Sequence, residues 1–338
     1  MKSERVYWID ALRAIAIVFV VIGHTPGVQG YGNIVKYLFS FHIPLFFFIS
    51  GLLFNSNLVK VTFPQFLHKQ VRALLIPYLI WGLLTYIPWL LITRHFSTYP
   101  DLNPLKPLLG MLYGVGGGTW LIHNGALWFL PCLFFTRLIF LGTLRNETRS
   151  FFPLVLLILT VLGILCVELI TVPIPWGFDI ALLAMSFFGT GYLLRDRLRS
   201  FQIPPTQYIL GILGGLFLLH IIIVLTNERV SMGDRTVGNG FLFEIGAFLG
   251  IMFWFLISKI IPKSSFISLL GENTMMIFIL HTFAFNLITG FAVFILKLPP
   301  TFKYESLIVS VIYTLIAIVF IIPFIAIVRR FQPWMIGR

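Results

Sequence analysis

The sequence of 338 residues is 58% hydrophobic and only 11% charged, and it carries a formal net charge of +12. A soluble globular domain has about 25% charged residues, so this chain cannot cover a water-facing surface, and most of its surface must face lipid. The Lys and Arg residues form no continuous run, which argues against a nucleic-acid partner. The positive charge instead indicates basic cytoplasmic loops beside anionic membrane lipids.

Apolar stretches of membrane-spanning length follow one another along the chain. A helix needs about 20 such residues to cross the hydrocarbon core. Windows of that length predict spans at 6–23, 34–54, 71–92, 126–144, 152–172, 177–194, 207–225, 241–261, 275–296 and 306–328. The interval from Thr93 to Gly125 is less apolar and is expected to be a loop. The sequence predicts an all-α, polytopic transmembrane bundle of about ten spans, forming a single domain over 1–338.

The direction of the chain follows from its loop charges. When the N-terminus is placed inside, 15 Lys and Arg residues fall in the inner segments and 7 in the outer ones. Cytoplasmic loops carry such an excess, so both termini are expected in the cytoplasm, and the protein is expected in the cytoplasmic (inner) membrane as a multi-pass protein.

The first predicted span carries an unusual set of polar residues: Asp10, Arg13 and, at its outer end, His24. Ionisable residues inside a bilayer are costly and mark functional sites by default. Asp10 can pair with Arg13 three positions later. Arg13 and His24 are eleven positions apart and therefore share a helix face, about 16 Å apart along the axis. The alternative is an Arg that snorkels to the headgroups and a His at the interface.

A second histidine, His42, lies in the outer half of the next span and is expected near His24. Neutral His can act as a base, a hydrogen-bond donor or a metal ligand. Two scattered histidines without an HExxH or a cysteine pair do not make a zinc site, so no metal is expected. Cys132 and Cys166 lie in apolar stretches and are expected to be buried thiols.

Three further groups of residues are candidates for substrate contact. Lys69 and Arg72 precede the third span, where they could bind a phosphorylated cytoplasmic substrate or follow the ordinary positive-inside bias. A glycine-rich outer loop leads to Trp128, which is either an aromatic platform suited to a sugar or part of the interfacial belt. His281 in the ninth span is either catalytic or part of a helix–helix hydrogen bond.

Two stretches resemble motifs of the acyltransferase-3 family of membrane-bound acyltransferases. Trp8–Ala14 with His24 looks like its first-helix motif, in which a basic residue is followed after ten residues by a His. Phe41–Gly51 looks like the next motif and is most similar to the fucose 4-O-acetylase-like branch. Softer matches cover nearly the whole chain: Lys69 and Arg72, with Lys where Arg is common; Leu127–Leu130; and Leu269, Gly271, Leu280 and His281.

The resemblance implies transfer of an acyl group, usually acetyl from acetyl-CoA, to a carbohydrate hydroxyl at the outer side of the membrane. It implies His24 as the catalytic base, with Arg13 and Asp10 on the same helix. Lys69 and Arg72 would hold the donor, and His42, Trp128 and His281 would contact the acceptor. The acceptor would be a polysaccharide, a lipid-linked glycan or its precursor.

A non-enzymatic reading competes with this one. A transporter or flippase of lipid-linked sugars would also have about ten spans with polar residues inside the membrane. It would not explain the spacing of Arg13 and His24 beside the second motif. A polysaccharide polymerase would normally have a long periplasmic loop, and the outer loops predicted here are short.

Overall fold

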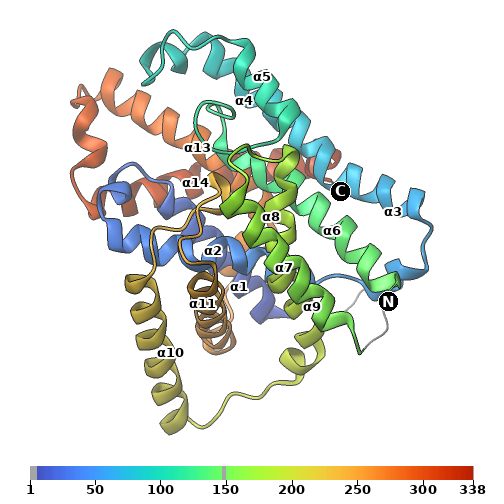
Figure 1. The fold of residues 1–338 in the computed structure, drawn as a ribbon. Coiled ribbons are helices and arrows are strands. Elements are labelled where there is room, and N and C mark those ends of the chain that lie inside the picture. The colour runs from blue at the N-terminus through green and yellow to red at the C-terminus, as the bar shows by residue number, and fades with distance from the viewer. Residues whose placement is uncertain (1–5, 147–149, 338) are drawn as a thin grey trace.

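The computed structural model describes residues 6–146 and 150–337, which form a bundle of helices with one isolated β-bridge between Ser231 and Thr236 (Figure 1). Lys2, Arg5, Arg149 and Arg338, which entered the loop-charge count, lie outside the described residues. The α-helices are α1 (Tyr7–Gly23), α2 (Gly32–Leu52), α3 (Phe63–Gln70), α4 (Ile76–Leu91), α5 (Leu105–Tyr113), α6 (Phe129–Asn146), α7 (Phe152–Leu169), α8 (Phe178–Leu183), α9 (Met185–Ser200), α10 (Thr206–Thr226), α11 (Gly240–Ile260), α12 (Ser265–Glu272), α13 (Thr274–Gly290) and α14 (Leu307–Phe331).

The long helices match the expected multi-pass architecture. Within the described residues, eight helices are long and apolar enough to cross a membrane. The segment Pro175–Leu183, which includes α8, and α9 meet at a bend of 54° and are either one further, broken span or a re-entrant loop. α1 has 17 residues, which at 1.5 Å each gives about 26 Å, close to the hydrocarbon thickness of about 30 Å. We take α1 as a span as well. The all-α polytopic fold is confirmed, whereas the count of ten spans and the cytoplasmic termini stay predictions.

Two regions differ from the sequence-based expectation. The third span was expected at 71–92, but the helix begins at Phe63, because α3 continues through a π-helical turn (Val71–Leu75) into α4. The interval expected to be a loop contains α5, which is apolar but too short to span. It packs against α4, where the Tyr78 hydroxyl donates to the Met111 carbonyl at 2.6 Å.

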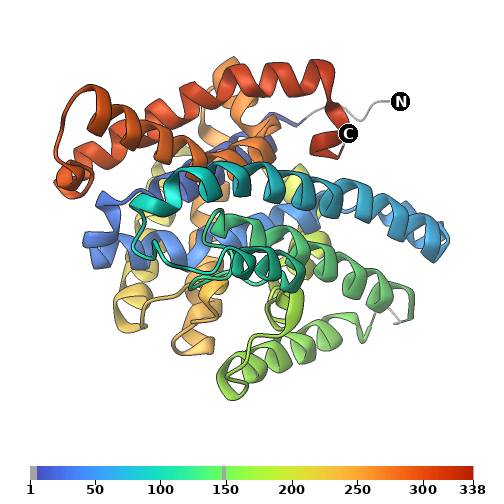
Figure 2. The same ribbon diagram turned by 90° about the horizontal axis from the view of Figure 1, so that it is seen from above.

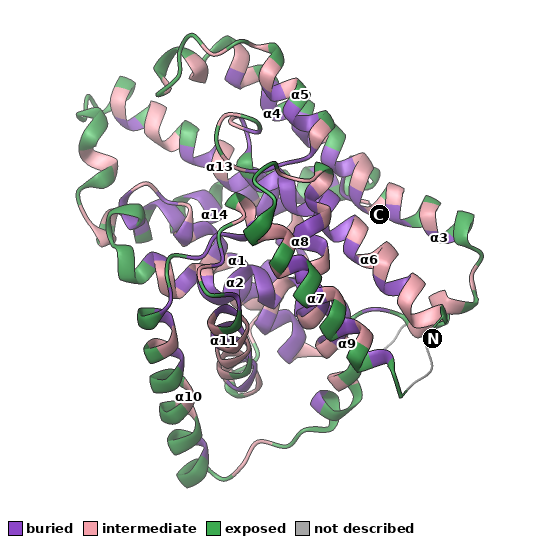
Figure 3. Cartoon of the chain, viewed as in Figure 1, coloured by how far each residue is buried: buried purple, intermediate pink, exposed green. Residues whose placement is uncertain are grey.

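The two N-terminal spans lie at the centre of the bundle. Figures 1 and 2 show α1 and α2 surrounded by the later helices, and Figure 3 shows most of α2 as buried. By contrast, α10 lies at the edge, and its buried residues are Ile209, His220 and Val224. Asp10 of α1 and His42 of α2 are buried inside protein, as intramembrane polar groups require.

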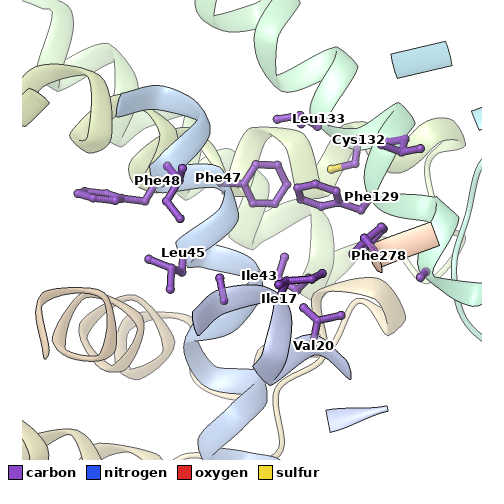
Figure 4. Packing of buried hydrophobic residues seen from close by; sticks show 14 of the residues in the cluster. Ile17, Val20, Ile43, Leu45, Phe47, Phe48, Phe129, Cys132, Leu133 and Phe278 are labelled. Carbon is purple, nitrogen blue, oxygen red and sulfur yellow. The ribbon is translucent and has the colours of Figure 1, made fainter. Parts of the chain in front are cut away.

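Phenylalanines fill the core between α2 and the start of α6. Figure 4 shows Phe47 facing Phe129, with Phe278 of α13 beside it. The ring centroids of Phe47 and Phe129 are 5.0 Å apart, and those of Phe129 and Phe278 are 5.4 Å apart. Aromatic pairs at such distances are favourable beyond the area they bury.

Small residues let the central helices approach closely. A Cβ added to Gly51 of α2 would lie 1.8 Å from the Phe188 carbonyl oxygen of α9, and one added to Gly191 of α9 would lie 2.1 Å from that of Phe48. A Cβ on Gly271 of α12 would lie 2.2 Å from the Asp10 carbonyl oxygen of α1. Membrane helices pack through such small residues, so these glycines fix where α1 and α2 lie.

Enlarging one of these glycines should destabilise the protein. Gly191→Val forces α2 and α9 apart and should cost about 1–3 kcal/mol or more, the usual range for overpacking. The control is Gly211→Val on α10, where an added Cβ meets nothing within 4 Å. Thermal unfolding in detergent should show a lower Tm for Gly191→Val alone. Equal Tm values for the two variants would contradict this packing.

Candidate active site

His24 lies at the C-terminal end of α1 with its ring held by the helix itself. Its Nδ1 is 2.7 Å from the Val20 carbonyl oxygen. A carbonyl can only accept a hydrogen bond, so Nδ1 carries the proton in the neutral ring and Nε2 keeps a lone pair. A positioned imidazole with a free Nε2 lone pair is able to act as a general base.

Two more histidines surround His24, and both are held in the same way. His42 Nδ1 lies 2.5 Å from the Leu38 carbonyl oxygen, and His281 Nδ1 lies 2.7 Å from that of Phe278. The ring centroid of His24 is 6.4 Å from that of His42 and 5.2 Å from that of His281. The consecutive helices α1 and α2 and the distant helix α13 thus bring their histidines together.

The Nε2 atoms of His42 and His281 have a distinct environment. Both atoms are buried and have no hydrogen-bond partner among the described residues. Because Nδ1 is the donor in each ring, both Nε2 atoms are acceptors that a substrate hydroxyl can satisfy. In residues 6–146 and 150–337, no group of three or more His, Cys, Asp or Glu side chains is arranged to hold a metal ion.

His24 and His42 line a cavity of about 380 Å³ at the C-terminal end of α1, which the loop charges predict to face outward. Its wall combines aromatic rings with polar groups from the loops at that end. The remaining lining residues are Gln29, Phe39, Ile43, Gly117, Gly118, Leu121, Ile122, Gly125, Ala126, Trp128, Arg229, Ser231, Met232, Gly233, Asp234, Phe278 and Thr282. We call this space the outer cavity.

The glycine-rich loop forms part of the wall of the outer cavity. A Cβ on Gly116 would come within 2.8 Å of the Trp128 ring, and one on Gly233 within 2.6 Å. The five-membered ring of the Trp128 indole therefore packs against two backbone segments that only glycine allows so close. Trp128 thus lines the outer cavity, and its role as an aromatic platform stays a prediction. Trp120, from the same loop, stacks on Tyr113 instead.

A buried ion pair fixes the loop after α10 against this wall. Arg235 donates from Nε to the Asp179 carboxylate at 2.5 Å, and from Nη2 to the carbonyls of Cys166 at 3.1 Å and Ile170 at 2.8 Å. The Asp179 side chain is 0% exposed. Breaking such a pair is costly because it leaves a buried charge without a partner. The pair therefore fixes the position of Arg235, and Asp234, the residue before it, lines the outer cavity.

A second cavity of about 180 Å³ lies further along α1 and contains Arg13. Arg13 Nη2 is 3.3 Å from the Thr274 hydroxyl, and Arg137 Nη1 donates to Gln70 at 3.0 Å. Asp10, expected to pair with Arg13, is buried on the same helix. The other lining residues are Phe46, Ile49, Ser50, Leu53, Leu74, Phe129, Leu130, Leu133, Met275 and Phe278. We call this space the inner cavity.

The structure places the two basic residues before the third span outside both cavities. Lys69 and Arg72 are exposed, whereas Leu74, two residues after Arg72, lines the inner cavity. Arg137 of α6 also lines the inner cavity, together with Arg13. Its one signal was a cation inside an apolar span. Asp234 and Ser231 gave no such signal, because outer-loop polar residues are ordinary.

Comparisons with known proteins agree with these observations. A family model described as an acyltransferase domain matches residues 6–330. The Nodulation protein NolL of Sinorhizobium fredii (strain NBRC 101917 / NGR234) is 32% identical over 96 residues, and the match covers 26% of this chain and 26% of that protein. The chain therefore matches about a quarter of the length of this curated relative. No solved structure matches.

Replacing His24 should remove most of the enzyme's activity without unfolding it. A general base typically contributes about 10² to 10⁴-fold, so His24→Ala should lose acyl transfer on that scale. His24→Gln should not restore it, because an amide does not accept a proton at neutral pH. His42→Ala and His281→Ala should lose less if they only orient the acceptor. The assay is acyl transfer in membranes that contain equal amounts of each variant.

The matched control for these histidine variants is His68→Ala, which removes an exposed imidazole on α3 that lines neither cavity. It should transfer like the wild type. Near wild-type transfer by His24→Ala at equal expression would refute the role of His24 as base.

Proposed function

The chain belongs to the acyltransferase-3 family, and from this premise we propose that it moves acetyl from cytoplasmic acetyl-CoA to a hydroxyl of a carbohydrate at the outer side of the membrane. The acceptor is a cell-surface polysaccharide, a lipid-linked glycan or its precursor. The membrane is the cytoplasmic one. The family match makes the chain a membrane acyltransferase, and the donor, the acceptor and the membrane are the proposed part.

One observation carries this proposal: the same buried helix lines both cavities. His24 at the end of α1 lines the outer cavity, and Arg13 lines the inner one. They are eleven positions apart, which corresponds to about 16 Å along the helix axis. A thioester donor is cytoplasmic and a surface glycan is not, so the reaction needs a site that both can reach. An extended pantetheine arm that enters at Arg13 can bring its thioester towards His24.

The chemistry at His24 is acyl transfer by general base catalysis. Nε2 takes the proton of the acceptor hydroxyl as its oxygen attacks the thioester carbonyl. A carbon–oxygen bond forms and the carbon–sulfur bond breaks. The coenzyme A thiolate leaves and takes the proton from His24 Nε2, which returns the imidazole to its neutral form. The Nδ1–H bond to the Val20 carbonyl becomes charge-assisted when the ring is protonated, and such bonds are stronger than neutral ones. The helix end thereby stabilises the imidazolium.

The polar and aromatic lining of the outer cavity supports a carbohydrate acceptor. Trp128 contributes an apolar ring to the wall, while Asp234 and the unpartnered Nε2 atom of His42 offer acceptors for hydroxyl groups. His281 is not among the lining residues, and it contacts the ring of His24. Small-molecule sites commonly combine aromatic walls with a few placed polar groups in this way.

The cations at the inner end support a phosphorylated donor. Arg13 and Arg137 line the inner cavity, and Lys69 and Arg72 lie on the exposed segment that leads to it. Guanidinium groups bind phosphates with charge-assisted, often bidentate hydrogen bonds. We assign Lys69 and Arg72 to the phosphates of coenzyme A and Arg13 to the inner part of its arm.

The direct experiment reconstitutes the purified protein in lipid vesicles. Acetyl-CoA is supplied on one side, a carbohydrate acceptor on the other, and ester formation on the acceptor is followed by mass spectrometry. We expect transfer only when the donor faces the α3 side, because the cations lie there. Vesicles with His24→Ala serve as the control. Movement of acceptor across the membrane without ester formation would refute an acyltransferase and favour a flippase.

A further inference from the structure

The two cavities are stacked along the same helices and share one lining residue, Phe278. On α13, Thr282 lines only the outer cavity, Thr274 lines only the inner one, and Phe278 lines both. On α2, Ile43 lines the outer cavity and Phe46, three residues later, lines the inner one. The level of Phe278 is therefore the boundary between the two spaces.

Three phenylalanines from three segments of the chain meet at this boundary. The ring centroid of Phe46 is 6.0 Å from that of Phe129 and 6.5 Å from that of Phe278, and Phe129 is 5.4 Å from Phe278. Figure 4 shows Phe129 and Phe278 side by side. These rings are apolar and offer water no strong hydrogen-bond partner. We call these three residues the aromatic layer.

Phe278 also stands next to the catalytic histidines. Its carbonyl accepts the hydrogen bond from His281 Nδ1 at 2.7 Å, and its ring centroid is 6.2 Å from that of His281. His281 in turn touches His24. An acyl group that reaches His24 from the inner cavity must pass the Phe278 ring and then lie beside it.

We propose that Phe278 is the gate between the two cavities and that its ring limits the size of the acyl group that the enzyme transfers. The limit on acyl size rests on the proposed function, whereas the gate does not. Of the aromatic layer, Phe278 alone lines both spaces, so rotating or removing its ring joins them. The closed ring keeps water and solutes from crossing when no donor is bound, and an acetyl arm displaces it.

The gate itself is tested by a labelling experiment that needs no activity. Thr282→Cys is placed in a background with Cys132→Ala and Cys166→Ala, and inside-out vesicles are treated with the anionic, membrane-impermeant thiol reagent MTSES. With Phe278 intact, labelling from the cytoplasmic side should be slow; with Phe278→Ala it should rise severalfold. Ser50→Cys, in the inner cavity, should label equally in both backgrounds. Equal labelling of Thr282→Cys in both backgrounds would overturn the gate.

The size limit is tested by transfer from acetyl-, propionyl- and butyryl-CoA. One methylene in an apolar pocket changes specificity by roughly 10- to 200-fold. Phe278→Ala should therefore raise the ratio of butyryl to acetyl transfer by about tenfold or more. Phe278→Leu should raise this ratio by a smaller factor, and it replaces the alanine variant in the test if that variant does not fold. Phe278→Trp should lower acetyl transfer itself.

The matched control is Phe187→Leu, a buried ring that packs on Phe243 and lines neither cavity. It should leave the acyl ratio unchanged. An unchanged ratio in Phe278→Leu and Phe278→Ala would overturn the size limit. If wild-type protein transfers nothing from acetyl-CoA, the proposed function fails, while the labelling result still decides whether Phe278 is a gate.

Discussion

The fixed geometry of α1 is the constraint on which the rest of the site depends. A helix rises about 1.5 Å per residue, so the eleven-residue interval sets the distance from Arg13 to His24 whatever else moves. Most of α1 is buried among the later helices, and Arg13 and His24 each line a cavity of the bundle. The other helices then supply what α1 lacks: histidines from α2 and α13, a cation from α6, and an aromatic layer between the two ends.

The cost of polar groups inside a membrane explains how these residues are arranged. Each of the three histidines satisfies its Nδ1 with a carbonyl of its own helix, so no charged partner is needed to hold the ring. The cations instead have side-chain partners on other elements, Thr274 for Arg13 and Gln70 for Arg137. An intramembrane ionisable group is energetically costly and tends to mark a functional path. In the proposed mechanism, the arginines lie at one end of the path of the donor and the histidines at the other.

The sequence predicted what depends on local periodicity and missed what depends on packing. Helical spacing alone placed Arg13 and His24 on one face, and charge composition alone gave the membrane fold. The approach of His281 to His24 depends on how α12 and α13 lie against α1, which a contact between Gly271 and Asp10 helps to fix. The pair Arg235–Asp179 joins residues 56 apart, and no spacing rule indicates it. The two cavities likewise arise from side chains of many helices.

The central claim is that donor and acceptor meet at His24 through the inside of the protein. The most direct measurement is a cryo-EM structure with a non-hydrolysable thioether analogue of acetyl-CoA. We expect the phosphates near Lys69 and Arg72, and the pantetheine arm beside Arg13 and past a displaced Phe278. The acyl mimic should lie within about 3 Å of the place where an acceptor hydroxyl would bind His24 Nε2. An analogue bound wholly on one side of the aromatic layer, with Phe278 in place, would contradict the account.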